Sequence, residues 1–350
     1  MVNLSRPTLL WEVWSGSGST VSNSEMALDG KTVPSEYDAD THSLSYTPEG
    51  PLRAGEHQVS CQVTIDGSLP VRKDWHFSIP SDAPASVPIA TSQQRQLIQS
   101  INEYRRQMDL PDFACENRLA AAALAHTEYL HTNNITGHCE TPGKPGFIGA
   151  MPLDRLESFG YMQDSWECVD YGGDNQDECL KDLFDAPYHR IPFMQPGNLK
   201  CGSGYDDRHL TVEFEMAKLT GTTVWPYNGQ KEVEPSWSSH ERPDPLRMHV
   251  TSGPVGYPIV FNQFTPDYEK ITLQGASLKS DDGGEVPIFV NSPSNDNKLS
   301  YSVIIMAQSP LRPNTTYSVW VKVATESGQT VSKNWSFTTS SGRTHGPRGR

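Results

Sequence analysis

The sequence is poor in the features that mark membrane proteins and nucleic-acid-binding proteins. None of its apolar runs approaches the roughly 18 residues that a membrane span requires, and AAALA at 121–125 is about the densest. The net charge is −14, whereas nucleic acids and anionic membranes are bound by basic surfaces. The sequence therefore predicts no membrane span and no nucleic-acid partner.

Common catalytic and targeting motifs are also absent. There is no GxSxG, HExxH, P-loop or Rossmann fingerprint, which argues against the usual hydrolase and nucleotide-binding machineries. The stretch DYGGDNQDECLK at 170–181 lacks the glycine at the sixth position of an EF-hand loop and ends in a lysine. The N-terminus has no basic region followed by an apolar one, so no signal peptide is visible.

The six cysteines follow no metal-binding spacing. No CxxC pair occurs, which argues against a thiolate zinc site. Five cysteines fall between residues 115 and 201, and we expect disulfides among them. Cys61 alternates with Val59 and Val63 on a strand, so we expect it to be a buried thiol.

Two distant segments of the chain resemble each other. Residues 51–80 and 310–339 both begin with PLR, continue through an alternating strand and a glycine-containing turn, and end in a second strand with the pattern W-x-F. Such hairpins resemble the bacterial immunoglobulin-like and fibronectin-like modules. The repeat predicts an all-β Ig-like sandwich at each end of the chain, over residues 1–88 and 244–340.

Between the two modules the hydrophobic period changes to that of helices. Apolar residues recur every three or four positions over 92–108 and 116–133, and further helices are expected at 152–160 and after Asp174, which is a plausible N-cap. Two strands follow around the DD turn at 206–207, so the segment 90–220 is predicted to be an α+β domain. Residues 221–243 are expected to be a linker, and 341–350 a disordered tail.

The most acidic part of the chain contains the candidate site. Residues 154–185 hold ten acidic against two basic residues, and histidines lie beside them at His138, His189 and His209. Imidazole together with carboxylate suits zinc, whereas carboxylates alone suit calcium. The alternative is a solvated acidic face, which is the common role of such runs.

The central segment resembles the CAP superfamily, which comprises cysteine-rich secretory proteins, antigen 5 and pathogenesis-related 1 proteins, and in particular its bacterial SCP-like branch. The landmarks are INEYRRQMDLPDF, AAALAHTEYL, NNITGHCE, GKPGFIGAMPLDRLESFGY and DAPYHRIPFMQPGNLKCGSGY, which occur in the family's order over about 92–218. The resemblance implies an α-β-α sandwich with a cleft lined by histidines and acids.

The resemblance also implies a set of cleft residues. His138 matches the histidine after the second helix, Glu167 the acid of G-E-N, and His189 the histidine of S-P-G-H-R. His209 matches a second family histidine loosely, and Glu213 or Glu215 on the same strand is an alternative acid. These residues imply a divalent metal, zinc or calcium, held by His138, Glu167, His189 and His209.

Three functions follow from these observations as hypotheses. The first is an extracellular binding or structural protein with a polar, metal-binding cleft. The second is a metal-assisted, peptidase-like hydrolase with Glu167 as general base, and the third is a lipid or glycan carrier. We expect a secreted or cell-surface protein whose ligand is a cell-wall polymer, a protein, a lipid or a glycan.

Overall fold

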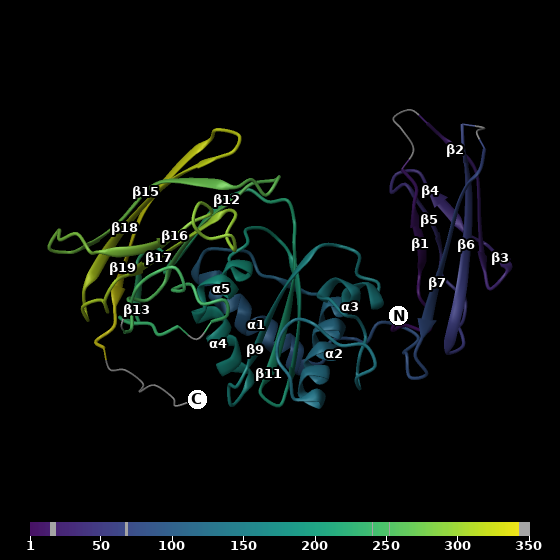
Figure 1. Cartoon of the computed structure of the whole chain (residues 1–350), viewed down its shortest axis with the longest axis horizontal. Coiled ribbons are helices and arrows are strands. Elements are labelled where there is room, and N and C mark those ends of the chain that lie inside the picture. Colours follow the sequence, from purple (N-terminus) through teal and green to yellow (C-terminus); the bar gives the residue numbers. More distant parts are fainter. Residues whose placement is uncertain (15–18, 67–68, 240, 252, 343–350) are drawn as a thin grey trace.

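The structure is a computed structural model that describes residues 1–14, 19–66, 69–239, 241–251 and 253–342. Strands form the first part of the chain, helices and strands the middle, and strands again the last part (Figure 1). None of the helices described is long and apolar enough to cross a membrane. From residue 343 onward, the predicted tail at 341–350 lies outside the described residues.

The N-terminal part is a sandwich of two sheets around one core. One sheet has the order β1-β5-β4 and the other β3-β2-β6-β7. Val59, Cys61 and Val63 alternate into the core as their spacing predicts, because successive side chains of a strand face opposite sides. The strands are β1 (Leu9–Glu12), β2 (Val21–Leu28), β3 (Lys31–Val33), β4 (Glu36–Asp38), β5 (Ser43–Tyr46), β6 (Gly55–Ile65) and β7 (Val71–Ile79).

The central part is built on a sheet with the order β8-β10-β11-β9, in which only the β8–β10 pair is parallel. Its strands are β8 (Ala114–Cys115), β9 (Ser165–Tyr171), β10 (Lys200–Asp206) and β11 (His209–Glu215), and its helices are α1 (Ser92–Gln107), α2 (Asn117–Asn133), α3 (Pro152–Ser158), α4 (Gln176–Asp185) and α5 (Pro187–Phe193). The helices lie close to the predicted ranges. The N-cap of α4 is Asn175 rather than Asp174, because the Asn175 side chain accepts hydrogen bonds from the first-turn amides.

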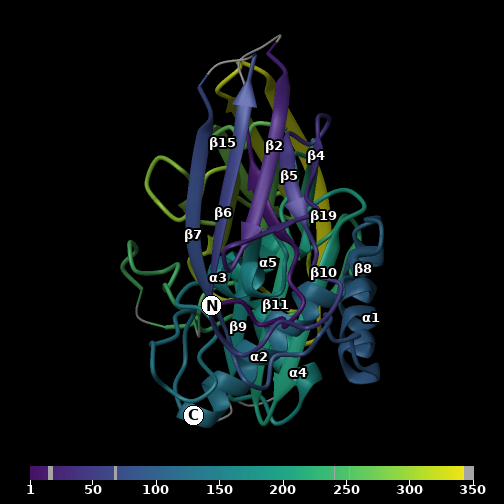
Figure 2. The same ribbon diagram turned by 90° about the vertical axis from the view of Figure 1, so that its right-hand side faces the viewer.

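Helices cover both faces of this sheet, as an α-β-α arrangement requires. On one face Thr211 of β11 meets Thr127 of α2 at a distance of 2.9 Å between the two hydroxyl oxygens. On the other face Leu210 and Val212 join a core with residues of α1, α4 and α5. Figure 2 shows these helices around the central strands from the side.

Two glycines let α2 approach the sheet closely. A Cβ on Gly202 would lie 2.1 Å from the backbone nitrogen of Ala120, and one on Gly204 would lie 2.3 Å from the Cα of Leu124. Both neighbours are helix backbone, which has no room to move aside. The contact between α2 and β10 therefore depends on the absence of side chains at these two positions.

The C-terminal part is a second sandwich, with sheets β12-β14-β17-β16 and β13-β19-β18-β15. The segment predicted as a linker, 221–243, contributes β12 and β13 to these sheets. That prediction was wrong. The alternation of polar and apolar residues in TTVW of β12 extends over too few residues to indicate a strand. The strands are β12 (Gly221–Trp225), β13 (Gln230–Val233), β14 (Ile259–Phe264), β15 (Ile271–Ser280), β16 (Ile288–Asn291), β17 (Ser302–Ala307), β18 (Thr316–Thr325) and β19 (Thr330–Thr339).

The central part and the C-terminal sandwich share one hydrophobic core. Tyr104 of α1 stacks on Phe184 of α4 with ring centroids 4.0 Å apart, and Phe184 meets Trp225 of β12 edge-on at 4.7 Å. Trp166 of β9 stacks on Tyr301 at 5.9 Å. The sequence predicted separate domains here, whereas the burial is continuous across the boundary.

Each of the two similar segments of the sequence forms a β-hairpin in the structure. Residues 51–80 contain the antiparallel pair β6 and β7, and residues 310–339 contain β18 and β19. The W-x-F ends fall on β7 and β19, where Phe77 and Phe337 are buried.

All six cysteines are free thiols, so the expected disulfides do not form in this structure. Cys61 is buried, as its position on an alternating strand predicts. Cys115 and Cys201 lie opposite each other on β8 and β10. Burial raises the pKa of both thiols, which favours the protonated form.

We predict that Gly202→Ala destabilises the chain, because its methyl group would overlap the α2 backbone. Overpacking of this kind costs about 1–3 kcal/mol or more of unfolding free energy. Urea denaturation followed by circular dichroism would measure it. Gly50→Ala is the matched control, since a Cβ there meets nothing within 4 Å. Equal midpoints for the two variants would contradict the close packing of α2 on β10.

Candidate functional site

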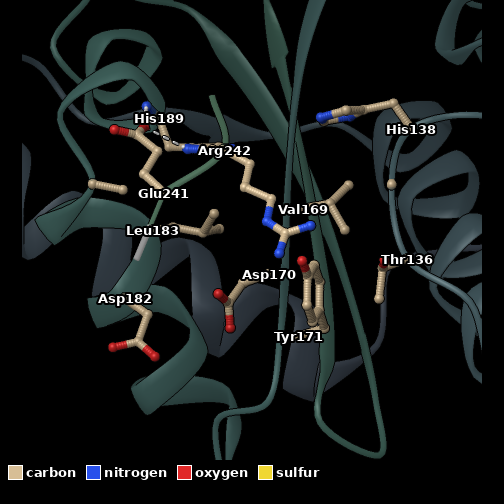
Figure 3. Close-up of a pocket in the computed structure, with 12 residues that line it drawn as sticks. Thr136, His138, Val169, Asp170, Tyr171, Asp182, Leu183, His189, Glu241 and Arg242 are labelled. Atoms are coloured by element: carbon tan, nitrogen blue, oxygen red, sulfur yellow. Dashed lines mark hydrogen bonds and ion pairs between the residues drawn. The ribbon is translucent and has the colours of Figure 1, made fainter. Parts of the chain in front are cut away.

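The candidate site is a cavity of about 230 Å³ beside the central sheet, called the cleft below. Three parts of the central segment form its walls: the loop after α2, the end of β9, and the region of α4 and α5. A segment that lies between β13 and β14 in sequence completes it. The lining residues are Thr136, Gly137, His138, Val169, Asp170, Tyr171, Asp182, Leu183, Ala186, His189, Glu241 and Arg242 (Figure 3).

His138 is held in the cleft wall by Glu167. The Nδ1 atom of His138 lies 2.8 Å from Oε1 of Glu167, whose side chain is only 2% exposed. Arg155 of α3, fully buried, donates to the other oxygen of Glu167 and to the backbone carbonyl of His138. His138 and Glu167, two of the residues predicted from the sequence, thus lie together in the structure.

The charge on Glu167 is stabilised by its neighbours. Burial by itself would raise the pKa of this carboxyl, but the hydrogen bond from His138 and the charge of Arg155 lower it to about 2. Glu167 therefore accepts the Nδ1–H of His138, and the Nε2 atom of that ring takes no part in this bond.

A second acid lies behind Glu167. Glu213 of β11 is the register partner of Glu167 of β9, and its side chain is fully buried. Burial, together with the negative charge of Glu167, raises the pKa of Glu213 well above its ordinary value. Glu213 thus stays protonated where Glu167 is ionised, and it neighbours the cleft without lining it.

The helix α2 contributes a buried histidine to the same network. His126 lies on the apolar stripe of α2 and is fully buried, as its position predicts. It is also hydrogen-bonded, with Nδ1 2.9 Å from Oε1 of Glu140 and Nε2 3.0 Å from the carbonyl of Gly137. Both ring nitrogens are engaged, so His126 supports the loop that carries His138 rather than facing a ligand.

His189 forms the opposite wall, and its partner comes from outside the central segment. The Nδ1 atom of His189 lies 2.7 Å from Oε1 of Glu241, which also accepts the His189 backbone N–H at 2.9 Å. Glu241 has a fully buried side chain, and its Oε2 has no hydrogen-bond partner in the described part of the chain. Sequence reasoning missed Glu241 because it lies 52 residues away, in a segment without periodicity.

Arg190, next to His189, has a fully buried guanidinium that donates to the carbonyls of Phe184, Asp185 and Pro258. It also donates to the hydroxyl of Tyr257. Arg190 therefore fastens the α4–α5 turn to the C-terminal sandwich through neutral acceptors.

His209 lies apart from the other candidates. It stacks on His131 of α2 with ring centroids 6.0 Å apart, and its Nδ1 bonds the carbonyl of Asp207 at 3.0 Å. It is not among the residues that line the cleft. Glu215, on the same strand, accepts a hydrogen bond from the backbone of Lys200.

The donor set fits a metal ion poorly. Within the described ranges, no group of three or more His, Cys, Asp or Glu side chains is placed to hold one. His138 and His189 lie on opposite sides of the cleft in Figure 3, and Nδ1 of each ring is occupied by a carboxylate. The arrangement offers two Nε2 atoms and several carboxylates to a ligand that forms hydrogen bonds.

Comparison with known proteins identifies the central segment. Residues 98–207 match the family model described as CAP, the cysteine-rich secretory protein family. This segment is a CAP domain. A search of curated proteins found no match.

Solved structures show only weak overall likeness to the chain. An extracellular protein containing an SCP domain from Bacillus anthracis is 17% identical, with a TM-score of 0.31, over 49% of this chain and 63% of that one, so less than two thirds of that protein is spanned. An outer surface protein from Borrelia burgdorferi is 18% identical, with a TM-score of 0.30, over 36% of this chain and 95% of that one. The copper resistance protein PcoC from Escherichia coli is 20% identical, with a TM-score of 0.21, over 33% of this chain and 94% of that one.

The CAP domain supplies only part of its own cleft. His138, Glu167 and His189 lie inside the matched residues 98–207, whereas Glu241 and Arg242 lie beyond them. Both of these residues precede β14, which belongs to the C-terminal sandwich. The cleft is therefore a composite of the CAP domain and the segment that follows it.

We predict that Glu213→Gln makes the chain more stable at high pH. The folded pKa of Glu213 lies above the ordinary value of 4.5, so above that pH the folded chain binds more protons there and loses stability as pH rises. The slope for one such proton is at most about 1.4 kcal/mol per pH unit. Glu167, whose pKa is lowered, contributes stability that is lost only as pH falls below 4.5 toward about 2.

Denaturant titrations between pH 5 and 8 would measure this effect. The stability gain of Glu213→Gln over the wild type should grow with pH, because glutamine cannot ionise. Glu157→Gln is the control, since Glu157 is exposed and should keep the wild-type profile. A pH-independent difference would contradict a raised pKa for Glu213.

Proposed function

We propose that this chain is a secreted or cell-surface binding protein whose CAP cleft takes a small polar ligand between His138 and His189. The observation that carries the proposal is the matched pair of imidazoles. Each donates its Nδ1–H to a buried carboxylate, Glu167 or Glu241. Each therefore keeps Nε2 for a ligand, in a fixed tautomer and orientation.

The lining favours binding over hydrolysis. No serine or cysteine is among the described residues that line the cleft, so neither a serine nor a cysteine nucleophile is at hand there. Glu167, the candidate general base, is buried behind His138 and paired with Arg155, which keeps it from a substrate in the cleft. A general base must reach the proton that it abstracts.

The lining also favours a hydrogen-bonded organic ligand over a metal ion. Zinc or calcium bound by His138, Glu167, His189 and His209 remains a prediction of the sequence. His209 lies outside the cleft, and Glu167 already accepts from His138 and Arg155, which leaves these four residues a poor common ligand set. A ligand with hydroxyl, amine or carboxyl groups would form hydrogen bonds with the donors and acceptors of the cleft without any rearrangement of these side chains.

The terminal sandwiches have separate roles in this proposal. The C-terminal one, which we take to be Ig-like, shares the core of the CAP domain and completes its cleft. The N-terminal one, also taken as Ig-like, acts as a spacer or an adhesive surface. Contact with a cell-wall polymer, a protein, a lipid or a glycan would place the cleft near its ligand.

We predict that His138→Ala and His189→Ala each weaken binding by roughly 2- to 10-fold, since a hydrogen bond to a neutral group contributes about 0.5–1.5 kcal/mol. Saturation-transfer NMR against a panel of neutral sugars, sugar acids, amino acids and polyamines would find the ligand, and calorimetry would give the affinities. His209→Ala is the matched control, because that ring lies outside the cleft.

Two outcomes would contradict this proposal. One is the absence of binding by every member of the panel, and the other is binding that neither substitution changes. A parallel titration with zinc tests the metal prediction. Zinc binding that His138→Ala and His189→Ala abolish, without any organic ligand, would replace the proposed function by a metal-binding one.

A further inference from the structure

The segment that completes the cleft is fastened at both ends. Residues 241–247 are called the cleft strap here. At its start Glu241 is bound to His189, and at its end Arg247 pairs with Asp296 of the C-terminal sandwich and donates to the hydroxyl of Tyr188. Leu246 is buried between these points. The strap is therefore fixed to the His189 wall of the cleft and to the C-terminal sandwich.

Arg242 of the strap extends into the cavity. Its side chain reaches from the His189 side toward Tyr171 and Asp170, so that the guanidinium lies in the middle of the cleft (Figure 3). No hydrogen bond or ion pair of Arg242 with the other described residues is present in the structure, although a guanidinium carries five N–H donors in a planar fork. An arginine so placed is suited to a carboxylate, which it binds through two parallel hydrogen bonds.

The rest of the cavity lining has the opposite chemistry. Asp170 and Asp182 belong to it, and each carboxylate has about four acceptor sites, so further hydrogen bonds from a ligand are accommodated. Tyr171 presents an aromatic ring that is 37% exposed, and Val169 and Leu183 add apolar surface. Such a surface accepts the C–H face of a sugar ring while the acids accept its hydroxyls.

Arg242 and the acidic residues of the lining together restrict the ligand. A simple cation would be repelled by Arg242, and an anion without hydroxyl donors would be repelled by Asp170 and Asp182. A cavity of about 230 Å³ is smaller than the roughly 300–1,000 Å³ of sites for drug-sized ligands, so it suits one small unit. A single sugar ring with one carboxylate meets these conditions of charge, hydrogen bonding and size.

The geometry points to a sugar carboxylic acid, a uronic acid taken singly or as the end unit of an oligosaccharide, as the ligand of the cleft. Arg242 binds its carboxylate, Asp170 and Asp182 accept from its hydroxyls, and Tyr171 packs on its ring. This inference rests on the proposed function, and it names the ligand class of that same cleft.

Calorimetric titration with D-glucuronate and D-glucose tests it, because the two sugars share a ring and differ in the carboxylate. The full chain should bind glucuronate at least tenfold more tightly than glucose. Arg242→Ala should reduce glucuronate affinity by roughly 10- to 100-fold, in line with a charge-assisted hydrogen-bonded pair, and leave glucose unchanged. Arg242→Lys should restore the affinity only in part, since lysine lacks the planar fork.

Arg72→Ala is the matched control, because it removes an exposed arginine from the N-terminal sandwich and should leave both affinities unchanged. Equal affinity for the two sugars, or glucuronate binding that Arg242→Ala does not weaken, would overturn the inference. If a neutral or amine ligand binds through His189 and glucuronate does not, the inference fails and the proposed function stands. If nothing in the panel binds, both fail.

Discussion

The cleft depends on one buried guanidinium. Arg155 is fully buried between two acids, bonding Glu167 and lying 3.7 Å from Glu140. Charges in the interior are tolerated only when they are paired, and removing one partner of such a pair costs about 3–5 kcal/mol. Each of these acids in turn holds a histidine, Glu167 that of the cleft and Glu140 that of α2. The orientation of the cleft wall therefore depends on a residue that no ligand touches.

The opposite wall depends on packing as well as on charge. Helices α4 and α5 of the CAP domain face the C-terminal sandwich, and aromatic side chains of the two parts pack against each other at the boundary. Because the core is continuous there, the segment between β13 and β14 runs beside the cleft, where it places Glu241 on His189. The sandwich thus positions the strap beside the cleft, and the residues 98–207 alone would lack Glu241 and Arg242 of this wall.

The sequence predicted the helices well because their periodicity extends over many residues. It also selected His138, Glu167 and His189, since a family pattern places them. Glu241 and Arg242 could not be predicted in this way. Nothing in the local sequence SHERPDP distinguishes an acid that accepts a hydrogen bond from a histidine from an acid that faces solvent. Glu213 was predicted only as an alternative to Glu215, although an acid between the buried Val212 and Phe214 on a central strand requires a partner across the sheet. The disulfides were expected from the number of cysteines alone, and this number does not show whether two cysteines lie close enough to form a bond.

The glycines beneath α2 have a consequence for the tolerance of the cleft. At Gly202 and Gly204 the backbone of α2 packs directly on the backbone of the sheet. No side chains lie between them that could rearrange and let the helix shift. The loop that follows α2 carries His138, so the position of the His138 wall depends on the contact of α2 with the sheet. The strap fixes the other wall from the C-terminal sandwich. If the proposed binding function holds, a cavity with both walls fixed in this way selects its ligand by size rather than by closing around it.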